Sequence, residues 1–260
     1  MFSSDLLIME EYKKQFAKLL AETGALFFKK GLRLKDGRPT PYFINMGKFN
    51  SGRLSYMLGL FFADMIFNSG IAKDIDIIFG PSYKGSAIAL STVISLWHKY
   101  GLDILFDYDR KEYKTYGEMS GSKGITVNNT LFDNCRIFIV DDVVSSMHTK
   151  YELIDKIKKE AVLKGITCNI LGIGIAVDRE QSSPVYDNNG NLLISEKGED
   201  AIKEFMTRTG IPVYKLIGIK ELITYLYQAN IPVLINDKWG FIGKDIKENL
   251  DEYLRLYGVS

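Results

Sequence analysis

One stretch of the chain decides the fold: Ile137-Phe138-Ile139-Val140-Asp141-Asp142-Val143-Val144-Ser145-Ser146-Met147-His148-Thr149. Its four leading apolar residues predict a strand that is buried on both faces of a sheet. The two carboxylates then stand at the C-terminal end of this strand, where open α/β sheets bind their ligands. The hydroxyl residues lie where a loop enters a predicted helix, and a helix N-terminus is a natural phosphate site. The stretch therefore predicts acids for sugar hydroxyls or a metal, beside a cradle for a phosphate.

Other apolar segments extend this pattern in both directions. We predict further strands over 42–45, 75–79, 103–108, 168–177 and 212–216. Helical spacing predicts helices over 5–23 and 53–68, one ending near 100, and others over 149–164, 199–208, 219–228 and at the C-terminal end. Strands that alternate with helices about every 30 residues indicate a parallel sheet with right-handed crossovers. The predicted fold class is therefore α/β, in a single domain.

Charged residues follow four of the predicted strands directly. They are Tyr83-Lys84, Arg110-Lys111, Asp141-Asp142 and Arg179. One charged strand end is ordinarily a solvated surface feature. The C-terminal ends of parallel strands meet at one edge of a sheet, however, so four such groups converge on one crevice. We therefore expect a binding site there.

Composition narrows the classes of function. A net charge of +1 gives no overall basic signal for nucleic acid. Cys135 and Cys168 do not have a metal-ligand spacing and are expected to be reduced, buried thiols, and two histidines make a histidine-rich metal site implausible. No apolar stretch is long enough to span a bilayer, and the first residues do not form a signal peptide. We expect a cytoplasmic protein with no nucleic-acid or membrane partner.

Residues 109–126 differ from the rest of the chain because they are polar, contain three glycines and have no apolar period. Long connections of this kind tend to be functional lids or disorder. The cations Arg110, Lys111 and Lys114 in this segment suit a lid that closes over a charged leaving group. A ligand with several phosphates and a ribose would fit the acids, hydroxyls and cations together. Mg²⁺ is expected, because it typically binds through carboxylates and substrate phosphates.

The motifs resemble those of type I phosphoribosyltransferases, and more narrowly those of the orotate phosphoribosyltransferase family. The strand with its diacid is the general mark. Four segments add the narrower resemblance, in family order: 34–45 is similar to the orotate-binding segment, 79–85 to the segment near pyrophosphate, 109–118 to the mobile catalytic loop, and 177–180 to the segment whose arginine contacts orotate. Together they extend over residues 34–180.

This resemblance implies a type I phosphoribosyltransferase fold, with a central parallel sheet flanked by helices. An N-terminal hood over about 1–50 would bind orotate, about 51–228 would form the core, and about 229–260 would be a helical extension, all within the single domain 1–260. The implied reaction converts orotate and phosphoribosyl pyrophosphate (PRPP) into orotidine 5′-monophosphate and pyrophosphate in pyrimidine biosynthesis. The implied cofactor is Mg²⁺, held mainly by PRPP and water near the diacid without direct protein ligands. The implied assembly is a homodimer that shares the lid between subunits.

The resemblance also assigns residues to roles. The catalytic residues would be Lys114, the key lid lysine, with Lys111, Arg110, Asp141 and Asp142. Orotate would meet Phe43, Ile44, Ser145 and Arg179, whose guanidinium would pair with the orotate carboxylate. PRPP would meet the same catalytic residues and Lys35, Tyr83, Lys84, Tyr116, Val143, Val144, Ser145, Ser146, Met147, His148 and Thr149. The segment from Ser145 to Thr149 would cradle the 5′-phosphate.

The chain departs from the family pattern in two places. Met147 stands where the family usually has glycine, so its side chain must point away from the ligand, and His148 follows it at the expected rim of the site. In the lid, Tyr116 replaces a familiar histidine, and a tyrosine donates a hydrogen bond without carrying positive charge. The segment 182–198, with a predicted hairpin turn at Asp187-Asn188-Asn189-Gly190, and the tail beyond about 228 exceed the compact family core.

Three other interpretations remain open at this point. A phosphoribosyltransferase for another base would give Arg179 no carboxylate to bind. A non-catalytic PRPP sensor that regulates transcription should show a helix-turn-helix or a basic face, and the sequence shows neither. A phosphoacceptor receiver domain should have its aspartate pair after the first strand, whereas Asp141 and Asp142 come far into the chain.

Overall fold

A five-stranded parallel sheet with the order β4-β3-β5-β6-β7 forms the centre of the molecule. Its strands are β3 (Ile77–Gly80), β4 (Leu105–Tyr108), β5 (Cys135–Val144), β6 (Cys168–Asp178) and β7 (Val213–Gly218). The structure is a computed structural model that describes residues 9–110, 124–144 and 146–259. The predicted parallel α/β sheet is confirmed, and β5 lies at its middle.

Alternate side chains of β5 lie on opposite faces of this sheet. Phe138 and Val140 pack in one hydrophobic cluster, whereas Ile137 and Ile139 pack in the other, and all four are fully buried. Gly174 on β6 leaves room for the Phe138 ring, because a Cβ atom there would lie 2.9 Å from it. Burial on both faces explains why the strand shows as an unbroken apolar run.

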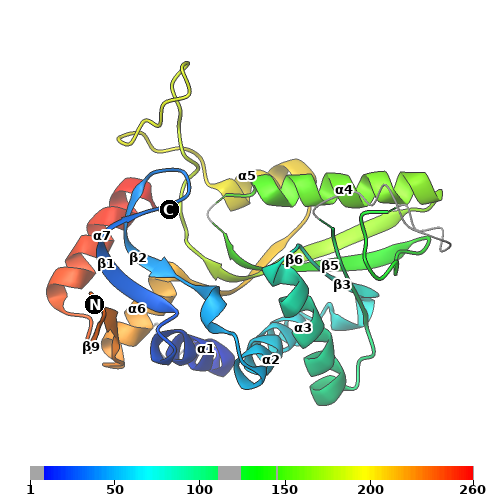
Figure 1. The fold of residues 1–260 in the computed structure, drawn as a ribbon, viewed down its shortest axis with the longest axis horizontal. Coiled ribbons are helices and arrows are strands. Elements are labelled where there is room, and N and C mark those ends of the chain that lie inside the picture. The colour runs from blue at the N-terminus through cyan, green and yellow to red at the C-terminus, as the bar shows by residue number, and fades with distance from the viewer. Residues whose placement is uncertain (1–8, 111–123, 145, 260) are drawn as a thin grey trace.

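Helices cover both faces (Figure 1). The helices α1 (Glu11–Glu22), α2 (Gly52–Asn68), α3 (Lys84–Tyr100) and α6 (Ile219–Gln228) contribute to the cluster that contains Phe138. The helices α4 (His148–Lys164) and α5 (Ala201–Thr209) contribute to the opposite cluster. Two short 3₁₀ helices, Met46–Lys48 and Ala72–Asp74, lie in connections. Each of these α-helices overlaps a segment that was predicted to be helical, although α1 begins at Glu11 rather than at residue 5, and residues 5–8 lie outside the described residues.

A second, smaller sheet has the order β2-β1-β8-β9 and joins the two ends of the chain. Its strands are β1 (Leu26–Arg33), β2 (Pro39–Ile44), β8 (Val233–Ile235) and β9 (Lys238–Gly240). β1 pairs antiparallel with β2 and parallel with β8. The terminal helix α7 (Lys244–Tyr257) packs beside β2 and buries Leu250, Tyr253 and Tyr257. The sequence did not predict β1, or any pairing between the N-terminal and C-terminal segments.

The Asn/Gly-rich segment 182–198 projects from the body of the molecule (Figure 1). Tyr186 pairs with Leu192 in an antiparallel bridge, and the backbone N–H of Gly190 donates to the carbonyl of Asp187 at 3.0 Å. The predicted hairpin turn is therefore confirmed.

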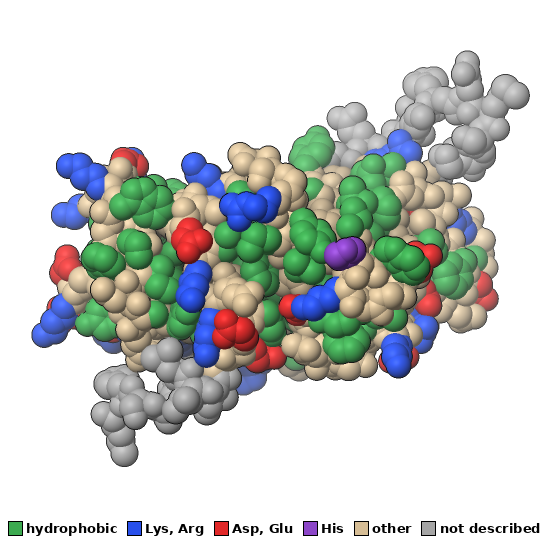
Figure 2. Space-filling view, turned by 90° about the horizontal axis from the view of Figure 1, so that it is seen from below, with side chains coloured by type: hydrophobic (Ala, Val, Ile, Leu, Met, Phe, Trp, Pro, Cys, Tyr) green, Lys and Arg blue, Asp and Glu red, His purple; other side chains and the backbone are tan. Residues whose placement is uncertain are grey.

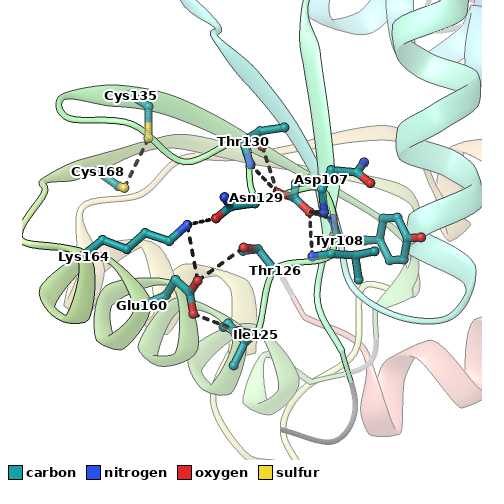
Figure 3. Close-up of polar contacts among 12 residues, drawn as sticks. Asp107, Tyr108, Ile125, Thr126, Asn129, Thr130, Cys135, Glu160, Lys164 and Cys168 are labelled. Carbon is teal, nitrogen blue, oxygen red and sulfur yellow. Dashed lines mark hydrogen bonds and ion pairs between the residues drawn. The ribbon is translucent and has the colours of Figure 1, made fainter. Parts of the chain in front are cut away.

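Cys135 and Cys168 face each other at the starts of β5 and β6, with their sulfur atoms 3.2 Å apart (Figure 3). Both are free thiols, and burial raises the pKa of Cys168 to about 12.

In the described part of the chain, no helix has both the length and the apolar character needed to cross a bilayer.

Candidate active site

The diacid lies within the last four residues of β5, because the strand continues through Val144. Asp141 is paired across the sheet with Ile175 of β6, and both carboxylates are partly exposed. Each also accepts a hydrogen bond from the next backbone N–H, at 2.8 Å for Asp141 and 2.7 Å for Asp142. The two acids are thus held at the carboxyl edge of the sheet, as predicted for a ligand site.

Each carboxylate of the diacid has a lysine partner. Lys150 of α4 forms an ion pair with Asp141 from an almost fully buried position, with its side chain 4% exposed. Lys84, the first residue of α3, lies 3.0 Å from Asp142 and keeps 57% of its side chain exposed. The first pair is therefore buried within the fold, whereas the second leaves an exposed cation beside the diacid. The sequence analysis identified Lys84 and missed Lys150.

The turn from β3 to α3 brings Tyr83 and Lys84 to the same edge. Gly80 and Gly85 allow the turn to close, because a Cβ atom on Gly80 would lie 1.9 Å from the Gly85 carbonyl oxygen. The peptide bond between Ser82 and Tyr83 is cis. Asp109, at the end of β4, accepts from the Ser82 N–H at 2.7 Å and pairs with Lys156 of α4 at 3.0 Å. Neighbouring strand ends are therefore tied together around the diacid.

The start of α4 follows β5 after a short loop. Met147 is 3% exposed and packs in the hydrophobic cluster below α4, so its side chain points away from the surface of the loop. His148 begins the helix with a side chain that is 79% exposed and lies 3.3 Å from Glu152. Ser146 and Thr149 are exposed, Val143 is partly buried, and Val144 is buried. Ser145 lies outside the described residues.

Arg179 follows β6 directly and is only 3% exposed. Its Nε donates to the Gln181 side chain at 2.8 Å, and its Nη2 donates to the Thr40 hydroxyl at 3.0 Å. Its guanidinium carbon lies 4.4 Å from the centre of the Tyr42 ring. The backbone N–H of Arg179 donates to the Val144 carbonyl at 3.3 Å, which places it beside the end of β5. Arg179 and the diacid therefore share one edge of the sheet.

The acids on either side of Arg179 bind a different cation. Lys215 of β7 contacts Asp178 at 2.9 Å and Glu180 at 3.0 Å. Burial by itself would lower the pKa of Lys215, but Asp178 and Glu180 outweigh it and raise the pKa. Arg179 consequently keeps neutral partners although it lies between two acids in the chain.

The N-terminal residues of the expected orotate site come from β2 and the turn before it. Phe43 is 36% exposed and packs against Phe27, with ring centres 5.7 Å apart. Ile44 is 5% exposed and belongs to the main hydrophobic cluster, because neighbouring strand residues face opposite sides. Lys35 is exposed in the turn between β1 and β2.

Two buried carboxylates hold the segment that returns to β5 after residues 111–123 (Figure 3). Asp107 accepts from the backbone N–H groups of Val127, Asn128 and Thr130 at 2.9–3.0 Å. Glu160 of α4 accepts from the Ile125 N–H at 2.8 Å. On the other side of residues 111–123, the buried Nε of Arg110 has no hydrogen-bond partner among the described residues. Lys111, Lys114 and Tyr116 lie outside the described residues.

A hollow of about 530 Å³ lies away from the diacid. It is a groove between the small sheet and α7, bounded by Lys29, Thr40, Asp245 and Tyr253 among others. The described residues contain no group of three or more acidic, histidine or cysteine side chains able to hold a metal ion.

The central parallel sheet flanked by helices is the fold of the type I phosphoribosyltransferase class. No family model matches the chain. An orotate phosphoribosyltransferase from Bifidobacterium adolescentis is 32% identical over 249 residues, which cover 94% of this chain and 97% of that protein. One from Clostridium acetobutylicum is 32% identical over 254 residues, or 96% and 100% of the two chains. The chain belongs to the orotate phosphoribosyltransferase family.

A solved structure supports the same assignment. The crystal structure of orotate phosphoribosyltransferase from Francisella tularensis is similar with a TM-score of 0.67 and 25% sequence identity. The match covers 94% of this chain and 98% of that one, so it extends well beyond the segment from β3 to β7 that forms the central sheet.

Proposed function

We propose that this chain transfers the 5-phosphoribosyl group of PRPP to orotate, which gives orotidine 5′-monophosphate and pyrophosphate on the route to UMP. The relatives from Bifidobacterium and Clostridium are named for orotate phosphoribosyl transfer. The single observation that carries the proposal for this chain is the buried cation at the end of β6.

Arg179 is buried among neutral groups, while the neighbouring acids Asp178 and Glu180 contact Lys215. An isolated buried charge is costly, so a cation without an acidic partner among the described residues favours an anionic ligand. The carboxylate of orotate suits the planar guanidinium, whereas uracil and adenine have no such group. Phe43 and Ile44 follow Tyr42 on β2, and the Tyr42 ring lies beneath the guanidinium of Arg179.

The diacid has a separate role in the proposed reaction. As the bond between ribose C1 and pyrophosphate loosens, positive charge develops on the ribose ring. Asp141 and Asp142 would bind the 2′- and 3′-hydroxyls and stabilise that charge. Lys84, 3.0 Å from Asp142 and largely exposed, is in position to contact pyrophosphate. The loop from Ser145 to Thr149 would bind the 5′-phosphate at the start of α4.

The remaining contacts are proposed for residues around the lid. Arg110 has a buried Nε without a partner among the described residues, which suits a phosphate oxygen. Lys111, Lys114 and Tyr116 are assigned to pyrophosphate from the family resemblance alone, as are Lys35 and Tyr83. Mg²⁺ would be held near Asp141 and Asp142 by PRPP oxygens and water, where it would offset phosphate charge.

We also propose that the molecule acts as a homodimer in which the lid reaches the neighbouring subunit. Leu90, Ile94 and Trp97 form an apolar stripe on α3, with exposures of 42%, 49% and 60%. Apolar side chains gather on the face that carries α1, α2 and α3 (Figure 2). A contiguous exposed apolar area of this kind marks an interaction surface. The single domain 1–260 and the cytoplasmic location stay predictions.

The proposal is tested by following orotate consumption spectrophotometrically with purified protein and PRPP. Turnover should require both Mg²⁺ and PRPP, and uracil or adenine in place of orotate should give no product. Turnover of adenine or uracil instead of orotate would show a transferase for another base. Tight PRPP binding with no turnover of any base would show a sensor.

A further inference from the structure

The C-terminal helix reaches Arg179 through an intermediate side chain. Gln181 accepts from the Nε of Arg179 at 2.8 Å, and its own amide nitrogen donates to the hydroxyl of Tyr253 on α7. Gln181 and Tyr253 are 5% and 6% exposed, so this contact is largely shielded from water. The amide of Gln181 is therefore held at both ends.

Tyr253 reaches Arg179 by a second route as well. Its ring meets the Tyr42 ring edge-on, with ring centres 5.9 Å apart, and Tyr42 in turn lies under the guanidinium of Arg179. The hydroxyl of Tyr253 thus fixes Gln181 while its ring supports Tyr42. Thr40 contacts the remaining side of the guanidinium from β2.

We propose that Tyr253 is a positioning residue for orotate recognition, which acts on Arg179 through Gln181 and Tyr42. The inference rests on the proposed function, since it requires Arg179 to bind the orotate carboxylate. It gives the C-terminal extension a role in substrate selection.

The chemistry of these partners explains why they suit this role. Gln181, Thr40 and Tyr42 are neutral, so they orient the guanidinium without neutralising it. An acidic partner in place of Gln181 would compete with the carboxylate of the substrate. A guanidinium held in one plane also loses less rotamer freedom when a planar, bidentate ligand binds.

The test compares the steady-state kinetics of Tyr253→Phe, Gln181→Leu and the double variant with those of the wild type. Tyr253→Phe keeps the ring on Tyr42 and removes only the hydroxyl. We expect each single variant to raise the orotate KM about three- to tenfold, as the loss of one hydrogen bond implies. The PRPP KM should stay unchanged. The double variant should be no worse than the poorer single variant, because both act along one chain of contacts.

Tyr257→Phe is the matched control, because Tyr257 lies on the same buried face of α7 and its hydroxyl is outside this network. It should leave the orotate KM unchanged, and thermal unfolding should show that all variants are folded. Equal increases in both KM values, or multiplicative effects in the double variant, would overturn the inference. A wild type that does not consume orotate would instead refute the proposed function on which the inference depends.

Discussion

Lys150 and Arg179 are both buried cations at the same edge of the sheet, yet they have opposite partners. Lys150 pairs with the carboxylate of Asp141, whereas the side chains that contact the Arg179 guanidinium among the described residues are neutral. The first cation therefore holds Asp141, a proposed catalytic acid, in place, and the second remains available to an anion. The sequence indicated Arg179 by its position after a strand. The sequence did not indicate Lys150, because a lysine near a helix start is common. Its role becomes visible only in the structure, where α4 packs against the sheet and brings Lys150 to Asp141.

Replacing Lys150 tests whether the buried pair supports the diacid. Lys150→Met would leave Asp141 without its cation, and breaking a buried ion pair typically lowers the free energy of unfolding by about 3 kcal/mol. The PRPP KM should also rise, because the carboxylate loses its fixed orientation. Urea denaturation and initial rates measure the two effects, with Lys150→Arg as the charge-preserving control. An unchanged PRPP KM would limit the pair to a role in stability.

The catalytic role proposed for Lys114 rests on the family resemblance of its sequence segment, because Lys114 lies outside the described residues. If it contacts pyrophosphate only as the leaving group departs, Lys114→Ala should lower kcat by about 10²- to 10³-fold. The KM for PRPP should change little, since ground-state binding uses other groups. Steady-state kinetics with Lys35→Ala as the comparison separate the two kinds of contact. A wild-type kcat would remove Lys114 from the catalytic residues.

At the scale of elements, burial decided what could be predicted. The strands β5 and β6 are apolar runs that lie between helices, and their positions were predicted to within a few residues. β1 was missed because Lys29, Lys30 and Gly31 interrupt its apolar residues and are exposed. Its parallel partner β8 is also too distant in the chain to leave a local pattern. The surroundings of Arg179 were not predicted for the same reason. Thr40, which contacts Arg179, and Tyr253, which contacts its partner Gln181, come from elements distant in sequence.

The edge of the central sheet opposite the site depends on an ion pair that should respond to pH. Arg136 of β5 binds Asp76, just before β3, through two side-chain hydrogen bonds of 3.0 Å each. These bonds, together with one from the Arg136 backbone, hold the pKa of Asp76 below its usual 3.8 despite some burial. A carboxyl group whose pKa is lowered by folding stabilises the folded state above its ordinary pKa. That stability is lost as the pH falls through the lower, folded-state pKa.

Asp76→Asn should therefore be less stable than the wild type at pH 7, by roughly 1 kcal/mol for a partly exposed pair. The difference should persist to about pH 4.5 and shrink as Asp76 becomes protonated below pH 4. Urea denaturation at several pH values measures it, and Asp103→Asn, an exposed acid near the same edge, is the control. A difference that does not vary between pH 7 and pH 3 would assign the effect to packing.

At the scale of the whole molecule, the apolar stripe on α3 is the surface through which we propose that two copies meet. Ile94→Asp places a charge at the centre of the stripe, between Leu90 and Trp97. If two copies meet there, the variant should be monomeric by light scattering at concentrations where the wild type is dimeric. Val162→Asp is the control, because Val162 is 77% exposed on α4, on the other side of the central sheet. A wild type that is itself monomeric would refute the homodimer.

The small sheet has a consequence for the order in which the molecule is made. Phe27 of β1 pairs with Leu234 of β8. The parallel pairing of β1 therefore cannot form until about 200 further residues have been synthesised. The central sheet needs no such delay, because its strands all lie between residues 77 and 218. Contacts between such distant segments form slowly, and domains begin to fold while the chain is still growing. A nascent chain should therefore be able to form the diacid edge of the central sheet early, and complete the support from Tyr253 only after β8 and α7 have been synthesised.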